Sequence, residues 1–466
     1  MMKRGQYANR FLKISSLVIA GILFLCACSP ESVSTEGQPG ETDPEYSDTA
    51  REMWIAVSEQ GAVRQSVSEL SDKNTSIILE STMGFNAGAV CDDKPLLELM
   101  NIFSEVNASP IYSDTGFDYF SDGEEAYQDM LASIRNAVDY IFLEYFLIDD
   151  GSVWVEFEEA LAEKVREGVE VRILVDGIAI QSYLPKDFIG KLESEGIAIH
   201  ITSPITRGQD YLSLMRDHRK MLVIDGKIVY TGGINIADEY ANRIVKAGHW
   251  KDNAIRLEGE CVKSFVLMFL QMWELFGEET EYDRYLACCE KNDDNGTYCM
   301  PYFDSALDDV LVGREVYRSI LENSEEEVRI TTPYFTPDDE LLELIKATAL
   351  RGVHVTMVLP GIPDRAILLV AARTYYSELS EAGVDIYEYT PGFLHQKVFV
   401  CDGCRCSVGS VNLDNRSLDG QYECGIYMYS EELADELNHD IDNIIAVSRH
   451  ITGEIIEGLE LAEPDD

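Results

Sequence analysis

Two stretches of this chain share one pattern: His218-Arg-Lys-Met-Leu-Val-Ile-Asp225 with Gly232-Gly-Ile-Asn235, and His395-Gln-Lys-Val-Phe-Val-Cys-Asp402 with Gly409-Ser-Val-Asn412. The His, Lys, Asp, Gly and Asn of the second stretch each follow their counterparts in the first by 177 residues. Five landmarks in one register would not recur by chance. The pattern therefore indicates a duplicated domain.

Weaker likenesses surround the two stretches. Residues 168–177 resemble residues 352–361, and the β-rich run 140–147 resembles the run 328–335. Helix-patterned segments such as 124–137 alternate with these short apolar runs. The alternation predicts an α/β fold in two halves, each a mixed β-sheet flanked by helices.

Each stretch carries the signal of a tight hairpin. Asp225-Gly226 and Asp402-Gly403 are type I′ turn sequences between apolar strands. A His and a Lys two positions apart on a strand point to the same face, about 7 Å apart along the chain. Each hairpin is therefore expected to present an imidazole and an ammonium at its start, with Asn235 or Asn412 following the return strand.

Two such units facing each other would place two His, two Lys and two Asn around one anionic centre. This set suits phosphoryl transfer, since one His can attack phosphorus, the other can protonate the leaving alkoxide, and cations and amides can bind the oxygens. Each His also needs a partner that orients it. Asp252 and Glu423 stand in comparable places, although solvated surface acids fit the spacing equally well. Asp225 and Asp402 look partly structural, with a pairing to a motif Lys as the alternative.

The doubled pattern His-x-Lys-x4-Asp-x6-Gly-[Gly/Ser]-x-Asn resembles the signature of the phospholipase D superfamily. Within it, the chain is most similar to bacterial cardiolipin synthases of the two-motif type, over residues 140–146, 216–220, 249–252, 332–337, 389–395 and 411–417. The resemblance implies two tandem phospholipase D-like domains with the active site at their pseudo-twofold interface. It also implies condensation of two phosphatidylglycerols into cardiolipin and glycerol through a phosphohistidine, with no metal or other cofactor.

The resemblance carries residue roles with it. His218 would be the nucleophile, and His395 the acid and then the base. Asp252 would orient His218, and Glu423 would orient His395. The motif residues counted as catalytic are His218, Lys220, Asp225, His395, Lys397 and Asp402, and the phosphate ligands, besides the two lysines, are Asn235 and Asn412. Two departures from the family leave the acceptor open: Asp419-Gly-Gln-Tyr-Glu423 lacks the family's usual Asn, and Pro301-Tyr-Phe-Asp304 does not match the expected phosphate-side pattern.

The N-terminus reads as a targeting segment. Four cations and no acid precede a 14-residue apolar run that ends in Leu25-Cys-Ala-Cys28, which resembles a bacterial lipobox. Residues 1–27 would then be a signal peptide, with Cys28 lipidated, or alternatively an uncleaved membrane anchor. Either reading attaches the protein to the bacterial cell membrane, and the lipobox favours catalytic domains on the outer side. The predicted organisation continues with a spacer and N-terminal region 28–105, domain 1 over 106–276, an acidic linker 277–310 and domain 2 over 311–466.

Composition narrows the class of protein. The chain has 466 residues and a formal charge of −47, which argues against a nucleic-acid partner. The expected partners are phosphatidylglycerol, other membrane lipids and the membrane surface, while the oligomeric state stays open. A phospholipase D-type hydrolase or headgroup-exchanging transferase would use the same residues with water or another alcohol. A membrane-tethered lipid-binding lipoprotein is the non-enzyme alternative, which would predict the loss of one motif. The Cys401, Cys404 and Cys406 cluster reads as buried filler rather than a metal site.

Overall fold

The computed structural model describes residues 93–97, 110–203, 215–277, 280–287, 297–305 and 311–456. The predicted signal peptide or anchor, Cys28 and the spacer lie outside the described residues. Within the described ranges, no helix has both the length and the apolar character needed to cross a bilayer.

The first half is built on a seven-stranded mixed sheet with the order β1-β8-β6-β5-β2-β3-β4. Its strands are β1 (Gly116–Phe120), β2 (Tyr140–Tyr145), β3 (Glu170–Asp176), β4 (Ala198–Thr202), β5 (Lys220–Ile224), β6 (Ile228–Gly232) and β8 (Ala254–Glu258). Its helices are α6 (Gly123–Asn136), α7 (Ser152–Glu167), α8 (Gly177–Ser182), α9 (Phe188–Ser194), α10 (Val262–Glu274) and α11 (Tyr282–Leu286).

The second half repeats this plan in an eight-stranded sheet with the order β19-β13-β12-β10-β15-β16-β18-β9. Its strands are β9 (Tyr298–Asp304), β10 (Glu327–Thr331), β12 (His354–Pro360), β13 (Asp385–Tyr389), β15 (Val398–Cys401), β16 (Arg405–Gly409), β18 (Glu423–Tyr429) and β19 (Ser448–His450). Its helices are α12 (Val312–Glu322), α13 (Asp339–Leu350), α14 (Ala366–Arg373), α15 (Tyr376–Ala382), α16 (Asn415–Gly420) and α17 (Glu431–Ala446).

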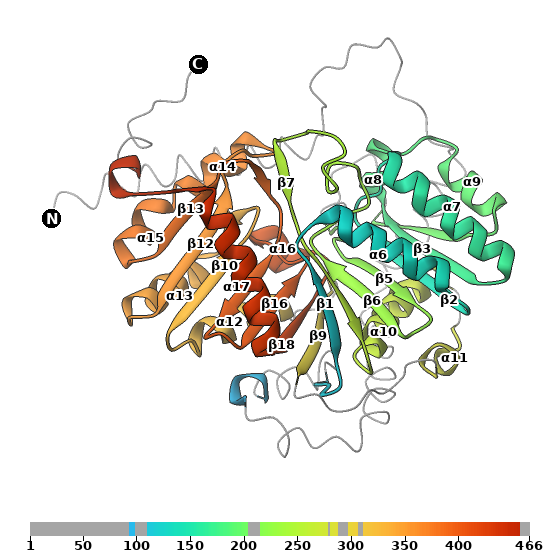
Figure 1. Ribbon diagram of the computed structural model, residues 1–466, viewed down its shortest axis with the longest axis horizontal. Helices are drawn as coiled ribbons and strands as arrows, with labels where there is room; N and C mark the ends of the chain where they lie inside the picture. The colour runs from blue at the N-terminus through green and yellow to red at the C-terminus, as the bar shows by residue number, and fades with distance from the viewer. Residues whose placement is uncertain are drawn as a thin grey trace, which may run out of the picture. The chain divides into compact units, whose positions relative to one another are not determined.

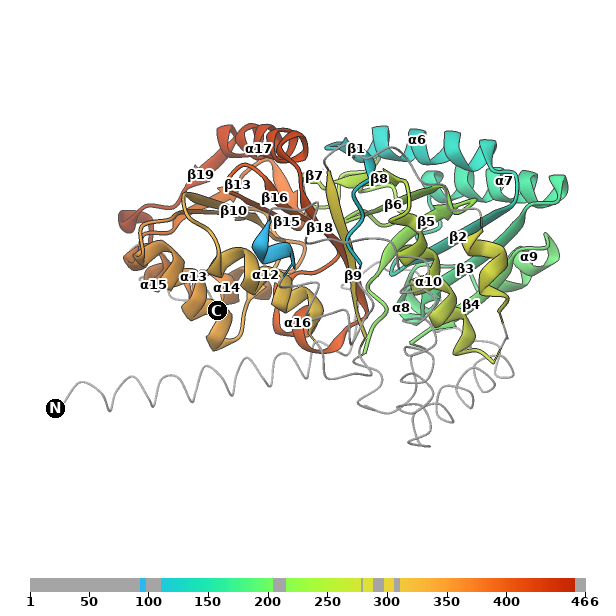
Figure 2. The same cartoon turned by 90° about the horizontal axis from the view of Figure 1, so that it is seen from below.

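The two sheets share one strand order once β19, which flanks β13, is set aside. Figure 1 shows them side by side, and Figure 2 shows that the helices are arranged inversely on them. In the first half α6 and α7 cover one face and α10 the other, whereas in the second half α17 lies on the side of α6 and α12 and α13 lie on the side of α10. This inversion is what a twofold relation between the halves requires, and it confirms the predicted duplicated α/β fold.

One predicted boundary is wrong. The segment 277–310 was expected to be a linker, yet it contains α11 and also β9, which pairs with β18 over seven residues. β9 occupies in the second sheet the edge place that β1 occupies in the first. Pro301 lies within β9 and lacks a backbone N–H, which an edge strand tolerates and a central strand does not. The second half therefore begins at its edge strand, before residue 311.

A common core joins the two halves. Buried side chains of α10, such as Phe265 and Phe269, belong to the same apolar cluster as Val398 and Val408 of the second sheet and Leu437 of α17. Separate clusters fill the outer part of each half. The shared cluster is consistent with burial of apolar surface as the main stabilisation of the junction at which the two motifs meet.

Candidate active site

The two hairpins form as their turn sequences predict. Asp225 and Gly226 have φ values of 53° and 63°, and Asp402 and Gly403 have 49° and 66°, so both central residues of each turn are left-handed as a type I′ turn requires. Strand β5 begins at Lys220, and β15 begins directly after Lys397. The two histidines and two lysines are all buried.

Each histidine segment pairs with backbone of the opposite half. The His218 N–H donates to the carbonyl of Tyr422 (2.9 Å), and the Tyr422 N–H donates to the carbonyl of Arg216 (2.9 Å). In the other motif, two short strands, β14 (Gly392–Leu394) and β7 (His249–Lys251), run parallel, and the His395 N–H donates to the carbonyl of Lys251 (2.7 Å). Tyr422 and Lys251 directly precede the two predicted carboxylates.

The exchange places each carboxylate beside the histidine of the other half. His218 Nδ1 lies 3.0 and 2.9 Å from the two carboxylate oxygens of Glu423, and His395 Nδ1 lies 2.6 Å from Oδ2 of Asp252. The predicted partners are therefore correct as a set, but the predicted pairing is wrong, because it matched each histidine with the carboxylate of its own half. The backbone crossover is the physical reason.

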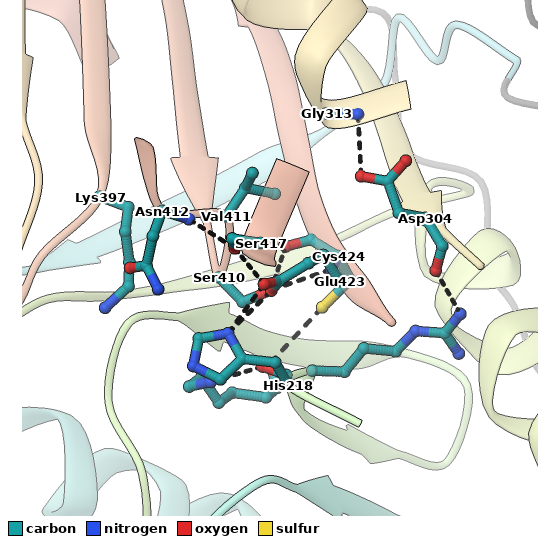
Figure 3. A network of polar contacts seen from close by, with 12 residues as sticks. His218, Asp304, Gly313, Lys397, Ser410, Val411, Asn412, Ser417, Glu423 and Cys424 are labelled. Atoms are coloured by element: carbon teal, nitrogen blue, oxygen red, sulfur yellow. Dashed lines mark hydrogen bonds and ion pairs between the residues drawn. The ribbon is translucent and has the colours of Figure 1, made fainter. Parts of the chain in front are cut away.

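The Glu423 carboxylate is held on its other side by two hydroxyl groups. Figure 3 shows it between the His218 imidazole and the side chains of Ser410 and Ser417, both of which donate to it. The position that corresponds to Ser410 in the first half is Gly233. A Cβ at Gly233 would lie 2.0 Å from Oδ1 of Asp252, so glycine is required there to admit the carboxylate. The residue at the Gly/Ser position of the motif thus depends on the carboxylate that it faces, with glycine beside Asp252 and serine beside Glu423.

The amide side chains differ between the halves. Asn235 Oδ1 accepts from the Leu147 N–H (3.2 Å), and its Nδ2 donates to the Tyr240 hydroxyl (2.6 Å). Asn412 Oδ1 is buried and has no hydrogen-bond partner within the described part of the chain. The Lys220 and Lys397 ammonium groups donate to the carbonyls of His218 and His395, and Lys397 Nζ lies 3.2 Å from His395 Nε2.

Burial sets the electrostatics of the site. It lowers the pKa of Lys397 to about 7 and that of Lys220 to about 8. Burial, aided by the charge of Lys397, lowers the pKa of His395 to about 3, and burial with the charges of Lys220, Lys397 and Arg416 lowers the pKa of His218 well below its usual value. Burial also raises the pKa of Glu423 to about 7. Burial in the unliganded site thus favours the uncharged forms of these groups, and a bound anion would raise the pKa values of the two lysines again.

Binding of a phosphodiester anion should therefore take up protons. Because the pKa values of Lys397 and Lys220 are depressed in the free protein and should rise beside an anion, we expect about one to two protons to be bound at pH 8.5. The affinity should fall as the pH rises from 7 to 9. Calorimetric titration with dimethyl phosphate, which does not titrate in this range, in buffers of different ionisation enthalpy measures the uptake. Proton release, or none, would contradict the assignment of the lysines as anion ligands.

The motif aspartates lie away from the reacting groups. Asp225 is five residues along β5 from Lys220, about 16 Å at the usual rise of a strand. Its carboxylate accepts backbone N–H groups of Val138, Asp139 and Tyr140 at 2.7 to 3.2 Å, and Asp402 accepts those of residues 325–327 at 2.8 to 3.0 Å. Counting Asp225 and Asp402 as catalytic is therefore corrected: they anchor each hairpin turn to the chain that enters the neighbouring strand.

Asp225→Ala should consequently lower stability and not chemistry. Removing a carboxylate that accepts three backbone donors should lower the free energy of unfolding by about 2 to 4 kcal/mol. Denaturant titration measures this, and turnover per folded molecule should stay within about threefold of the parent protein. Asp187→Ala is the control, since Asp187 is exposed and caps no N–H of α9. Unchanged stability together with lost turnover would restore a catalytic role.

Two further site residues were not predicted from the sequence, although the sequence contains a signal for them. Tyr240 and Ser417 stand five residues after Asn235 and Asn412, so they too are separated by 177 residues. Ser417 Oγ accepts the Asn412 N–H (2.9 Å), and the Tyr240 ring meets the His395 ring edge-on with centroids 5.4 Å apart. Because the two residue types differ, the shared position does not stand out in the sequence.

The buried cation that directly follows His218 was also not predicted as a site residue. Arg219 lies over the rings of Phe303 and Tyr422, at 5.5 and 5.4 Å from their centroids, and donates to the carbonyl of Asp304 (3.0 Å). Its guanidinium is 3.5 Å from a carboxylate oxygen of Glu144. The counterpart of Arg219 in the second motif is the neutral Gln396, so the residue that follows the motif histidine is charged in the first half and uncharged in the second.

The cysteine cluster behaves as packing. Cys401 and Cys406 are buried within β15 and β16, and Cys404 lies in the turn between them. Across the described ranges, no group of three or more His, Cys, Asp or Glu side chains has the geometry to hold a metal ion.

A duplicated mixed sheet whose paired His and Lys residues meet at a twofold interface defines the phospholipase D-like class. The chain belongs to the family described as cardiolipin synthase, PLD-like domain, whose profile matches residues 130–273 and 317–445. A crystal structure of phosphatidylserine synthase from Haemophilus influenzae has the same fold, with a TM-score of 0.63 at 15% identity over 79% of this chain and 93% of that one.

Relatives by sequence agree with this family. An uncharacterized protein of Streptococcus mutans is 43% identical over 343 residues, which is 74% of each chain. A cardiolipin synthase of Halalkalibacterium halodurans is 34% identical over 69% of this chain and 64% of its own length. One of Alkalihalophilus pseudofirmus is 31% identical over 73% and 68%. The chain thus spans about two thirds of the curated cardiolipin synthases that it matches.

Proposed function

We propose that this protein is a cardiolipin synthase that transfers a phosphatidyl group from one phosphatidylglycerol to another. The observation that carries the proposal is the pair of buried imidazoles, each bonded through Nδ1 to a carboxylate of the other half. An imidazole that donates from Nδ1 keeps the Nε2 lone pair for attack on phosphorus. The depressed pKa values of both histidines favour this neutral, nucleophilic form before substrate binds.

The first half-reaction forms the intermediate. His218 Nε2 attacks phosphorus, a P–N bond forms, and the bond from phosphorus to the glycerol oxygen breaks. His395, whose imidazolium form is favoured once the phosphate anion is bound, gives its proton to that oxygen, so that glycerol leaves uncharged. Lys220, Lys397 and the amides of Asn235 and Asn412 offset the charge that develops on the phosphoryl oxygens.

The second half-reaction reverses the proton flow. A headgroup hydroxyl of the second phosphatidylglycerol gives its proton to His395 and attacks phosphorus, and the P–N bond to His218 breaks. Cardiolipin leaves, and both imidazoles return to their starting states. Over the two steps one P–O ester bond is broken and one is formed, so the number of phosphodiesters is unchanged and the reaction needs no external energy source. This scheme makes the acceptor hydroxyl, and not the His pair, the feature that separates synthase from hydrolase.

We further propose that the protein acts at the outer side of the bacterial cytoplasmic membrane. The support is the charged start, apolar run and lipobox-like ending of residues 1–28. Mass spectrometry of the purified chain tests the attachment, with a mature N-terminus at a lipidated Cys28 expected. An intact Met1 would leave the uncleaved anchor as the attachment.

Product analysis tests the reaction. Vesicles of phosphatidylglycerol should yield cardiolipin and free glycerol in equal amounts, with and without a chelator, and His218→Ala should yield neither. Phosphatidic acid with free glycerol in place of cardiolipin would identify a hydrolase with the same catalytic centre. No turnover of phosphatidylglycerol would overturn the proposed reaction.

A further inference from the structure

An exposed apolar surface borders the active site. It consists of Ile362, Ile367 and Val370 around α14, which are 41%, 46% and 58% exposed, and of Ile244 and Val245, which are 48% and 83% exposed. We call this set the apolar rim. Helix α14 has the sequence Ala-Ile-Leu-Leu-Val-Ala-Ala-Arg, and only Ala372 of its eight residues is buried. A helix with this composition is expected to bury its apolar residues against something.

The two parts of the rim lie beside each other. Ile362 N–H donates to the carbonyl of Gly392 (3.4 Å), and Gly392 also bridges to Gly248. The His249 N–H donates to the carbonyl of Pro391 (2.9 Å), so the segment after Val245 meets the same turn as the segment before α14.

The rim lies close to the reacting groups. A small cavity beneath α14 is lined by Leu368 and Leu369 of the helix and by Tyr334 and Phe393 on its floor. The Phe393 ring centroid is 6.0 Å from that of Tyr334 and 5.7 Å from that of His395. Only one aromatic layer therefore separates the underside of α14 from a catalytic imidazole.

The charge of these segments contrasts with the rest of the chain. Asp and Glu make up 84 of the 466 residues, yet residues 365–377 and 241–251 contain none, and Asp364 is the one acid between Ile362 and Ile367 of the rim. Because Arg243, Lys246 and Arg373 are paired with acids of neighbouring segments, this surface carries little net charge, so an anionic bilayer would repel it less than the acidic remainder. A soluble protein partner would not need the acids to be missing from two segments that are distant in the sequence.

We propose that the apolar rim docks on the surface of an anionic phospholipid bilayer, with Ile367 and Val370 inserted among the headgroups and upper acyl chains. This inference rests on the proposed function, because a lipid substrate must bring its phosphate to a buried centre while its acyl chains stay out of water. Docking at the rim lets the headgroup reach His395 without full extraction of the lipid.

Turnover of lipids in two physical states tests the inference. The double variant Ile367→Glu, Val370→Glu should lower turnover of long-chain phosphatidylglycerol in vesicles by at least about tenfold. Turnover of monomeric dihexanoyl phosphatidylglycerol should stay within about twofold. The matched control is Val138→Glu, Leu350→Glu, at positions that are 76% and 71% exposed. These residues precede the N-terminal ends of β2 and β12, whereas the rim residue Ile362 follows the C-terminal end of β12. Equal losses on both substrates, or no loss on vesicles, would overturn the proposal.

A second readout does not depend on turnover. Val370→Trp and Leu350→Trp in the full chain are compared on vesicles whose acyl chains are brominated, with the parent protein as the background. The added Trp at position 370 should be quenched, and that at position 350 should not, even though the N-terminus tethers both proteins. Absence of quenching at 370 would overturn docking. If the parent protein turns over neither lipid, the proposed function fails, while quenching still tests the docking surface.

Discussion

His218→Ala should reduce lipid turnover by about four orders of magnitude, and His395→Ala should do the same. The two side chains are buried at the junction of the halves, and each has its Nδ1 taken by a carboxylate, so no neighbouring group can replace either imidazole. Steady-state product formation from phosphatidylglycerol measures the loss. His354→Ala is the control, because His354 is exposed on β12 and pairs with Asp385. Retained activity in either catalytic variant would contradict the two-histidine scheme.

An activated substrate separates the two roles. Phosphatidyl p-nitrophenol has a leaving group that needs no proton, so His395→Ala should still release a burst of nitrophenolate and trap a phosphatidyl adduct. His218→Ala should give neither. Mass spectrometry of the trapped protein should place the adduct on His218. An adduct on His395 in the reciprocal variant would exchange the two roles and leave the rest of the scheme intact.

Glu423→Gln and Asp252→Asn should each lower turnover by about two to four orders of magnitude, because an amide partner no longer stabilises the imidazolium and permits the wrong tautomer. Both substitutions keep the volume of the side chain, so packing around the fully buried carboxylates is preserved. Asp187→Asn, at an exposed position, should have no effect. Turnover within about threefold of the parent would show that the carboxylates do not assist the imidazoles.

Nitrogen-15 NMR of labelled histidines tests the crossed pairing itself. Glu423→Gln should move the Nδ1 signal of His218 and leave that of His395 in place, and Asp252→Asn should do the reverse. A shift of the histidine in the same half would support the uncrossed pairing that the sequence alone suggests. The signals are assigned with the two His→Ala variants, which each remove one of them.

The sequence predicts the repeated elements well because the spacing of residues within each copy is local and can be compared directly between the copies. Strand hairpins with Asp-Gly turns, the His and Lys at the start of each hairpin, and the alternation of helices with strands all follow from spacing and residue type. The edge strand β9 was missed because a run of acidic and polar residues precedes it and because Pro301 interrupts its alternation. Its pairing with β18 overrides both signals.

The pairing of histidines with carboxylates could not be predicted in the same way. Nothing in the order of residues says that the chain before Asp252 runs beside the chain before His395, because this contact exists only when both halves are folded. Linear proximity instead suggested partners within one half. The function of Ser417 was hidden for a related reason, since its hydroxyl meets Glu423 only after α16 turns it inward.

The strand exchange between the halves has a consequence for the life of the protein in a membrane. A chain in which only one half has folded holds an imidazole without its carboxylate and a carboxylate without its imidazole, so it has no competent nucleophile. Under the proposed mechanism, lipid turnover therefore requires both halves of the chain to be folded. The crossed contacts thus make reactivity depend on the integrity of the whole chain in that mechanism.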